Sequence, residues 1–131
     1  MEHKPKYLPR DKHDFERVNE LFQLDPPIIV PLIPRLVEWL QDINWPIASD
    51  VAKLLLKYPE ETIPHIKAVL NSKDDIWKNG CLLYFVQKLP ELYIVQFKNE
   101  VTRIATDPTQ GELLEEVNET AKRVLVFFDK R

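Results

Sequence analysis

Apolar residues recur along this chain at spacings of three and four residues, the pattern of helices that bury one face. Prolines fall mostly between these segments, where they end one helix or begin the next. The chain has only two glycines, too few for the turns of an all-β fold. The pattern therefore predicts an all-α protein. The expected helices cover about residues 11–24, 31–41, 44–58, 60–70 and 75–89, a looser segment over 90–106, and a last helix over 109–128.

Polar residues and prolines set the expected ends of the first two helices. Asp11 or Asp14 can cap the first helix, because an aspartate there accepts hydrogen bonds from the free N–H groups of the first turn. Pro31 and Pro34 complicate the second helix, since a proline inside a helix costs roughly 3 kcal/mol. We therefore expect this helix to begin near Pro31, with residues 28–30 in a turn or a kinked lead-in.

The last expected helix has one apolar face and one acidic face. Thr109-x-x-Glu112 has the form of a capping box, which marks the start of the helix. An acidic side suits a terminal unit, whose outer face must meet water. The apolar face is expected to hold Leu113, Val117, Ala121, Val124 and Phe128, and the acidic side Glu112, Glu115, Glu116 and Glu119.

Segments of the chain return after about thirty residues. A period of this length is typical of stacked helix pairs, in which each pair buries its apolar face against the next. The repeat predicts an α-α superhelix of about three helix pairs preceded by an N-terminal helix. The matching segments are Ile33-Pro34-Arg35-Leu36 with Ile63-Pro64-His65-Ile66, Asp42-Ile43-Asn44-Trp45 with Asp74-Asp75-Ile76-Trp77, and Lys57-Tyr58-Pro59-Glu60 with Lys88-Leu89-Pro90-Glu91.

Residues 25–129 resemble the HEAT/armadillo class of α-helical repeats. The small size, the Asp-x-x-Trp loops and the proline-ended helices are similar to small bacterial HEAT-like proteins of unknown function. The resemblance implies a single HEAT-like repeat domain over residues 11–131, after an N-terminal arm over residues 1–10 that has little to bury. A HEAT unit usually carries an Asp and a downstream Arg that tie neighbouring loops together. Here Asp42 and Asp74 stand at loop positions, but no Arg follows at matching places.

Composition and charge narrow the class of protein. The 131 residues are 44% hydrophobic and 30% charged, which fits one soluble globular domain. The net charge is −3 and no basic stripe stands out, so a nucleic-acid partner is not expected. The N-terminus lacks the apolar core of a signal peptide and no apolar run could span a membrane. Together with the single cysteine, Cys81, this predicts a cytoplasmic protein.

Motifs that carry catalysis or cofactor binding are absent from the sequence. It has no glycine-rich phosphate loop, no nucleophile elbow and no dinucleotide-binding turn. His3, His13 and His65 lack the spacing of metal ligands, and Cys81 has no second cysteine beside it. Cys81 lies in an apolar stripe with Trp77, which indicates a buried and inert thiol. We therefore predict no catalytic residues, no metal, no cofactor and no enzyme activity.

Two equivalent loops bring acidic and aromatic residues to the start of a second helix. In the structural interpretation, the aspartate caps that helix and the tryptophan packs against the preceding one. In the functional interpretation, the loops stack along one edge and present both kinds of group to a partner. The second helices also carry polar positions that are expected to face solvent, Lys78 among them. The candidate partner-binding residues are Asp42, Trp45, Asp74, Asp75, Trp77 and Lys78.

The leading hypothesis is a non-catalytic protein–protein interaction module whose partner is unknown. By the resemblance, one version of this role is a toxin-neutralising immunity protein. The alternative from another class is an uncharacterised enzyme or a nucleic-acid-binding HEAT-like protein, which clustered Lys and Arg in a concave cleft would favour. Self-association through the apolar stretch 28–33 is a further alternative, and the oligomeric state stays open.

Overall fold

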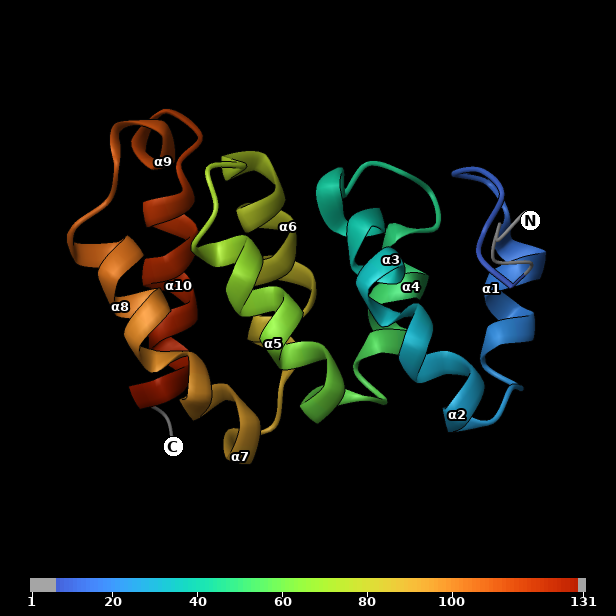
Figure 1. Cartoon of the computed structure of the whole chain (residues 1–131). Coiled ribbons are helices and arrows are strands. Elements are labelled where there is room, and N and C mark those ends of the chain that lie inside the picture. The colour runs from blue at the N-terminus through green and yellow to red at the C-terminus, as the bar shows by residue number, and fades with distance from the viewer. Residues whose placement is uncertain (1–6, 130–131) are drawn as a thin grey trace.

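The computed structural model describes residues 7–129, which form helices and connecting turns and contain no strand. Figure 1 shows the helices following one another across the molecule in chain order, with α4, α6 and α10 behind α3, α5 and α8. The all-α prediction is confirmed for these residues. The α-helices are α1 (Phe15–Leu21), α2 (Pro26–Ile29), α3 (Ile33–Val37), α4 (Ala48–Leu55), α5 (Pro59–Leu70), α6 (Asp75–Tyr84), α7 (Glu91–Ile94), α8 (Lys98–Thr106), α9 (Gln110–Leu114) and α10 (Val117–Asp129), and the 3-10 helices are η1 (Val30–Leu32), η2 (Glu38–Gln41), η3 (Val86–Lys88) and η4 (Val95–Phe97).

The first helix is capped by Asp14, whose carboxylate accepts a hydrogen bond from the Arg17 backbone N–H at 3.3 Å. The Arg10 guanidinium also donates to this carboxylate, at 2.8 and 3.0 Å, and lowers the pKa of Asp14 below its usual range. Of the expected N-terminal arm, residues 1–6 lie outside the described part. The expectation of little burial is wrong for Leu8, which is 9% exposed and joins the core.

The proline-rich segment becomes helical earlier than expected. The second helix begins at Pro26 rather than near Pro31, and helical structure continues through α2, η1, α3 and η2 to Gln41. Each proline stands in the first two positions of its own segment, where its missing N–H removes no helical hydrogen bond. Ile29 and Ile33 are fully buried within the chain, so the apolar stretch suggested for self-association belongs mostly to the core.

Two other helices are shorter than the sequence pattern predicts. α4 begins at Ala48, not at residue 44, because the Asp42 carboxylate accepts from the Asn44 N–H at 2.9 Å and so forms a tight turn ahead of the helix. α6 ends at Tyr84, not at residue 89, and Phe85, with φ −119° and ψ −63°, is its C-cap. A 3-10 turn then leads to Pro90.

The core runs through the row of helices. α3 packs against α4 and α5, α5 packs against α6, and α10 packs against both α6 and α8. Apolar residues at helical spacing supply most of this core, with Val51, Ile66, Phe85, Val101 and Val124 each fully buried. Among the helices of residues 7–129, none is both long enough and apolar enough to cross a membrane. The connections η2–α4, α5–α6 and α8–α9 all lie along one edge of the row of helices, the upper edge in Figure 1, and we call it the loop edge.

Candidate partner-binding edge

The loop edge contains the six predicted site residues, but Asp42 and Trp45 have a structural role there. Asp42 forms the turn with Asn44 and is not the cap of α4, whose N-cap is Ile47, so that expectation is wrong. Trp45 packs edge-on against Trp39 of η2, with ring centroids 5.3 Å apart and the planes at 71°. The prediction that this tryptophan contacts the preceding helix is confirmed.

The second aspartate–tryptophan loop differs from the first. Asp74 is the N-cap of α6, as predicted, and its carboxylate accepts from the Trp77 backbone N–H at 3.1 Å. The Trp77 indole Nε1 donates to the backbone carbonyl of Val37 at 3.1 Å, so the ring is held against α3. Trp45 therefore packs against a neighbouring segment of the chain, whereas Trp77 joins α6 to a helix 40 residues earlier.

One side of α6 meets the end of α3 and η2 through uncharged groups, and we call this contact the neutral junction. Beyond Trp77, the backbone of Gly80 lies so close to the Leu40 carbonyl oxygen that a β-carbon there would overlap it. One turn further on, the Tyr84 hydroxyl approaches the Ile43 carbonyl oxygen at 3.5 Å. Residues three and four apart on α6 thus lie on one face and meet carbonyl groups that are three residues apart in the earlier segment. Glycine is required at the point of closest approach, because any side chain there would overlap the backbone.

The other side of α6 meets α8 and α9 through buried charges, and we call this contact the charged junction. The Lys78 ammonium lies 2.9 Å from an Asp75 carboxylate oxygen and 2.8 Å from one of Glu112. The Arg103 guanidinium makes a bidentate pair with Glu112, each distance being 2.7 Å. The Lys78 side chain is 3% exposed and that of Glu112 is 0% exposed. Lys78 was expected to face solvent and Glu112 to lie on an outer acidic face, and both expectations are wrong.

The surroundings of Glu112 keep it ionised although it is buried. Burial alone would raise its pKa, but hydrogen bonds from Arg103, from Lys78 and from the Thr109 backbone N–H outweigh that effect and lower the pKa to about 2. The Thr109 hydroxyl in turn accepts from the Glu112 N–H at 3.1 Å, which completes the predicted capping box. The capping box was visible in the sequence, and it predicts the bond of this carboxylate to the Thr109 N–H but not its burial.

Helix α9 buries its charged residue, Glu112, and exposes its apolar residues, the reverse of what helical periodicity predicts. Its leucines face the solvent, with Leu113 52% exposed and Leu114 75% exposed. The predicted single helix over 109–128 is therefore wrong: it breaks after Leu114, and Glu116 takes a left-handed conformation with φ 59°. This conformation is costly for a residue with a β-carbon. Because of this break, the buried face of α9 need not continue the buried face of α10. α10 buries Val117, Ala121 and Val124 as expected.

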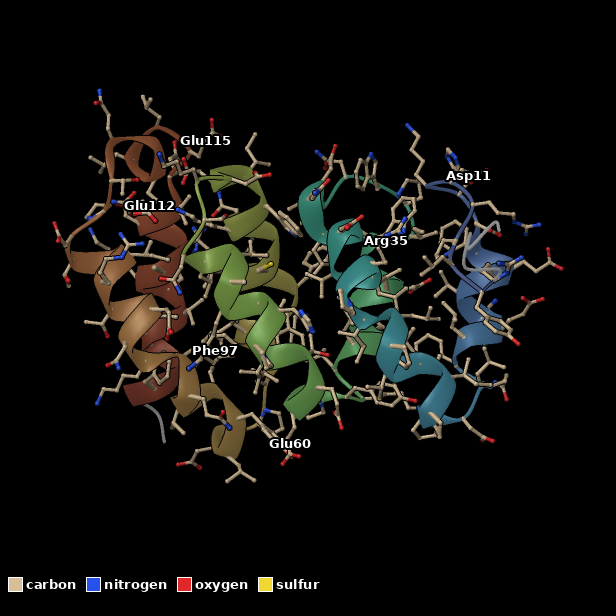
Figure 2. All side chains as sticks on the ribbon, in the orientation of Figure 1. Asp11, Arg35, Glu60, Phe97, Glu112 and Glu115 are labelled. Carbon is tan, nitrogen blue, oxygen red and sulfur yellow. The ribbon has the colours of Figure 1, made fainter. Side chains whose placement is uncertain are left out.

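α9 lies along the first turns of α6, and a hollow lies beside this contact. A β-carbon on Gly111 would overlap the Asp75 carboxylate, and the Asn79 side-chain amide donates to the Glu115 backbone carbonyl at 2.9 Å. Asp75 and Glu115, one residue from each of these contacts, also line a shallow, open hollow of about 440 Å³. Figure 2 shows Glu112 and Glu115 together at this end of the molecule and Glu60 at the opposite end. The hollow is lined by Lys73, Asp74, Asp75, Ile76 and Glu115.

Of the predicted site residues, the structure brings together Asp74, Asp75 and Lys78, with Asp42, Trp45 and Trp77 used in packing and turns. Asp74 is exposed, whereas Lys78 is buried and cannot reach a partner directly. Ile76, 57% exposed, and the two leucines of α9 complete the exposed apolar groups of this region. The helical period assigned Leu113 to the buried face of the last helix, which is wrong, and it gave no reason to expect Ile76 or Leu114 at a binding surface.

The described residues offer no other evident chemistry. Within residues 7–129, no group of three or more His, Cys, Asp or Glu side chains is arranged to hold a metal ion. Cys81 is buried as predicted, and burial raises the pKa of its thiol far above the usual range. A buried, protonated thiol is a poor nucleophile.

The comparison with protein families gives one match over most of the chain. The model of a family described only as a domain of unknown function (DUF5071) matches residues 7–125. A comparison with curated proteins gives no match.

Proposed function

The chain belongs to the DUF5071 family, and on that premise we propose that it is a non-catalytic scaffold of stacked helix pairs that binds another protein through its loop edge. The row of helices in chain order and the repeated segments support a HEAT-like solenoid. The buried cysteine supports a cytoplasmic location. A toxin-neutralising role is one version of this function, and a secreted toxin encoded beside this chain would support it.

The observation that carries the proposal is the inverted helix α9. Burying a leucine side chain contributes roughly 2 kcal/mol, yet α9 leaves Leu113 and Leu114 exposed and buries Glu112 in their place. It does so beside Glu116, which adopts a strained backbone conformation. A fully buried carboxylate and adjacent exposed leucines are each uncommon, and their combination on α9 supports the proposal of an interaction surface here. A partner that covers the two leucines would gain the free energy of burying their apolar surface, which folding alone does not provide.

The experiment is photocrosslinking in the native host at a single position. The change is Leu114→p-benzoylphenylalanine, which puts a reactive group on the proposed surface, and mass spectrometry then identifies the products. We expect one dominant crosslinked protein. A matched control exists on the far side of the chain, because Leu92 on α7 is 72% exposed, almost the same as Leu114.

The same probe at Leu92 is expected to give no product in common with position 114. If both positions give the same set of proteins, or if position 114 gives none, the loop edge is not a protein-binding surface. Circular dichroism of both variants checks that the helices are intact. An enzyme or nucleic-acid role is less well supported, since the exposed charges of the hollow are mostly acidic.

A further inference from the structure

We propose that the partner presents a basic and apolar segment to the loop edge, with a Lys or Arg side chain in the hollow and large apolar side chains on Leu113 and Leu114. This inference rests on the proposed function and adds the chemistry of the partner. It follows from the way that charged and apolar groups are distributed around α9 and the start of α6.

The charge of the hollow comes from carboxylates that the fold leaves accessible. Three carboxylates, of Asp74, Asp75 and Glu115, line it against one ammonium group, that of Lys73. Asp75 is already paired with Lys78, and its side chain is 17% exposed. Asp74 and Glu115 are the exposed members, so they are the carboxylates that a partner can reach.

A cationic side chain fits this hollow better than an anionic or a purely apolar one. Opposite charge on the two surfaces steers the encounter and disfavours wrong partners, and pairs at the rim do so without deep desolvation. Ile76 lines the same hollow and is 57% exposed, which gives the methylene stem of a Lys or Arg an apolar surface to cover. The occupant is therefore a long cationic side chain rather than a small cation.

The exposed leucines require a second feature of the partner. Leu114 directly precedes Glu115, so the apolar face of α9 begins where the acidic hollow ends. A partner segment that alternates basic and large apolar residues can cover both at once. A purely basic segment would leave the leucines exposed, and a purely apolar one would leave the carboxylates without a counter-charge.

The probe is a short amphipathic peptide of arginine and leucine, compared with a peptide in which glutamate replaces every arginine. Each is titrated into the uniformly ¹⁵N-labelled full chain, and the backbone amide shifts are followed. We expect the arginine peptide to shift amides within residues 73–79 and 110–116 and the glutamate peptide to leave them unchanged. Equal binding of both peptides at the loop edge would overturn the inference, and so would an absence of shifts there with the arginine peptide.

Charge reversal supplies the matched variants. Asp74→Lys with Glu115→Lys is expected to weaken the arginine peptide by about tenfold, whereas Glu60→Lys with Glu61→Lys, two exposed acidic residues at the other end of the molecule, should leave affinity within about twofold. Asp74 caps α6, so Glu115→Lys alone is tested as well, and it should still weaken binding. Unchanged affinity in Glu115→Lys and in the double variant would sink the proposal.

Failure of this inference can be told from failure of the proposed function. A specific crosslinked partner at position 114 whose contact segment lacks Lys and Arg would leave the interaction role standing and overturn only the partner's chemistry. No crosslink at position 114 would remove the proposed function itself. A partner segment containing Lys or Arg beside large apolar residues would support both.

Discussion

The two sides of α6 are joined to their neighbours by different chemistry. At the neutral junction, Trp77 donates to the Val37 carbonyl and Gly80 lets two backbones approach closely. At the charged junction, Lys78 and Arg103 converge on the buried Glu112 carboxylate. The first kind of contact depends on shape and the second on complete pairing, because a buried charge that loses its partner is strongly destabilising. The comparison predicts different sensitivities to substitution and to pH.

The largest effect is expected from Glu112→Ala. The change leaves Lys78 buried with Asp75 as its remaining ion-pair partner and removes the ion pair of Arg103, so the free energy of unfolding should fall by about 4 kcal/mol. Urea denaturation followed by circular dichroism measures it. Glu119→Ala is the control, since its ion pair with Lys122 is 55% exposed on both sides and should contribute less than about 1 kcal/mol. A similar loss in both variants would show that burial of the junction does not matter.

Acid should weaken the charged junction selectively. The folded pKa of Glu112, about 2, lies below its ordinary value of 4.5, so this group stabilises the protein above about pH 4.5 and the contribution is lost as the pH falls towards 2. The loss should be about 3 kcal/mol. Denaturation at several pH values compares the wild type with Glu112→Gln, whose curve should be flatter over this range. Asp14 titrates in both proteins, so the difference isolates Glu112. Parallel curves would contradict the assigned pairing.

Substitution of the two glycines compares how tightly the neutral junction and the charged junction are packed. Gly80→Ala should lower the free energy of unfolding by about 2 kcal/mol, because its β-carbon would overlap the Leu40 backbone and the helices would have to separate. Gly111→Ala meets a side chain, that of Asp75, which can turn aside, so its effect should be about 1 kcal/mol. Thermal denaturation of both variants measures the order. The reverse order would mean that the charged junction is the more tightly packed of the two.

The smallest effect is expected from Trp77→Phe. The substitution keeps an aromatic ring but removes the indole N–H that reaches the Val37 carbonyl, which should cost about 1 kcal/mol. Trp45→Phe keeps the edge-on ring contact with Trp39 and should cost less. Both values come from urea denaturation. A larger loss in Trp45→Phe would show that the Trp39–Trp45 packing, and not the Trp77–Val37 hydrogen bond, decides the stability of this region.

Much of the fold could be predicted because its signals are local. Caps depend on a few neighbouring residues, and Asp14, Asp74 and Thr109 all cap the helices that the sequence assigned to them. The ends of helices with competing signals were less predictable. The Asp42 turn delays α4, and the prolines of residues 26–34 are accommodated by changes between α and 3-10 geometry.

The site was predicted only in part because its pairings are distant in the chain. Lys78 and Glu112 are 34 residues apart in the chain, and no local sequence pattern predicts that they form a buried ion pair. From the sequence, one continuous helix is expected after Thr109, and helical periodicity then places Leu113 on the buried face and Glu112 on the exposed face. The conformation of Glu116 reverses that assignment, and a left-handed glutamate has no sequence signal of the kind that glycine provides.

The contact of α6 with the end of η2 has a consequence for pieces of this protein. Trp77, Gly80 and Tyr84 close over the carbonyl groups of Val37, Leu40 and Ile43 only when α6 is present. A synthetic peptide spanning residues 26–44 lacks those contacts and should stay largely unstructured in water, as short isolated helices do. Added α5–α6 peptide would then act as a template for it, so that complementation between fragments, rather than autonomous folding, is the behaviour to expect of a truncated chain.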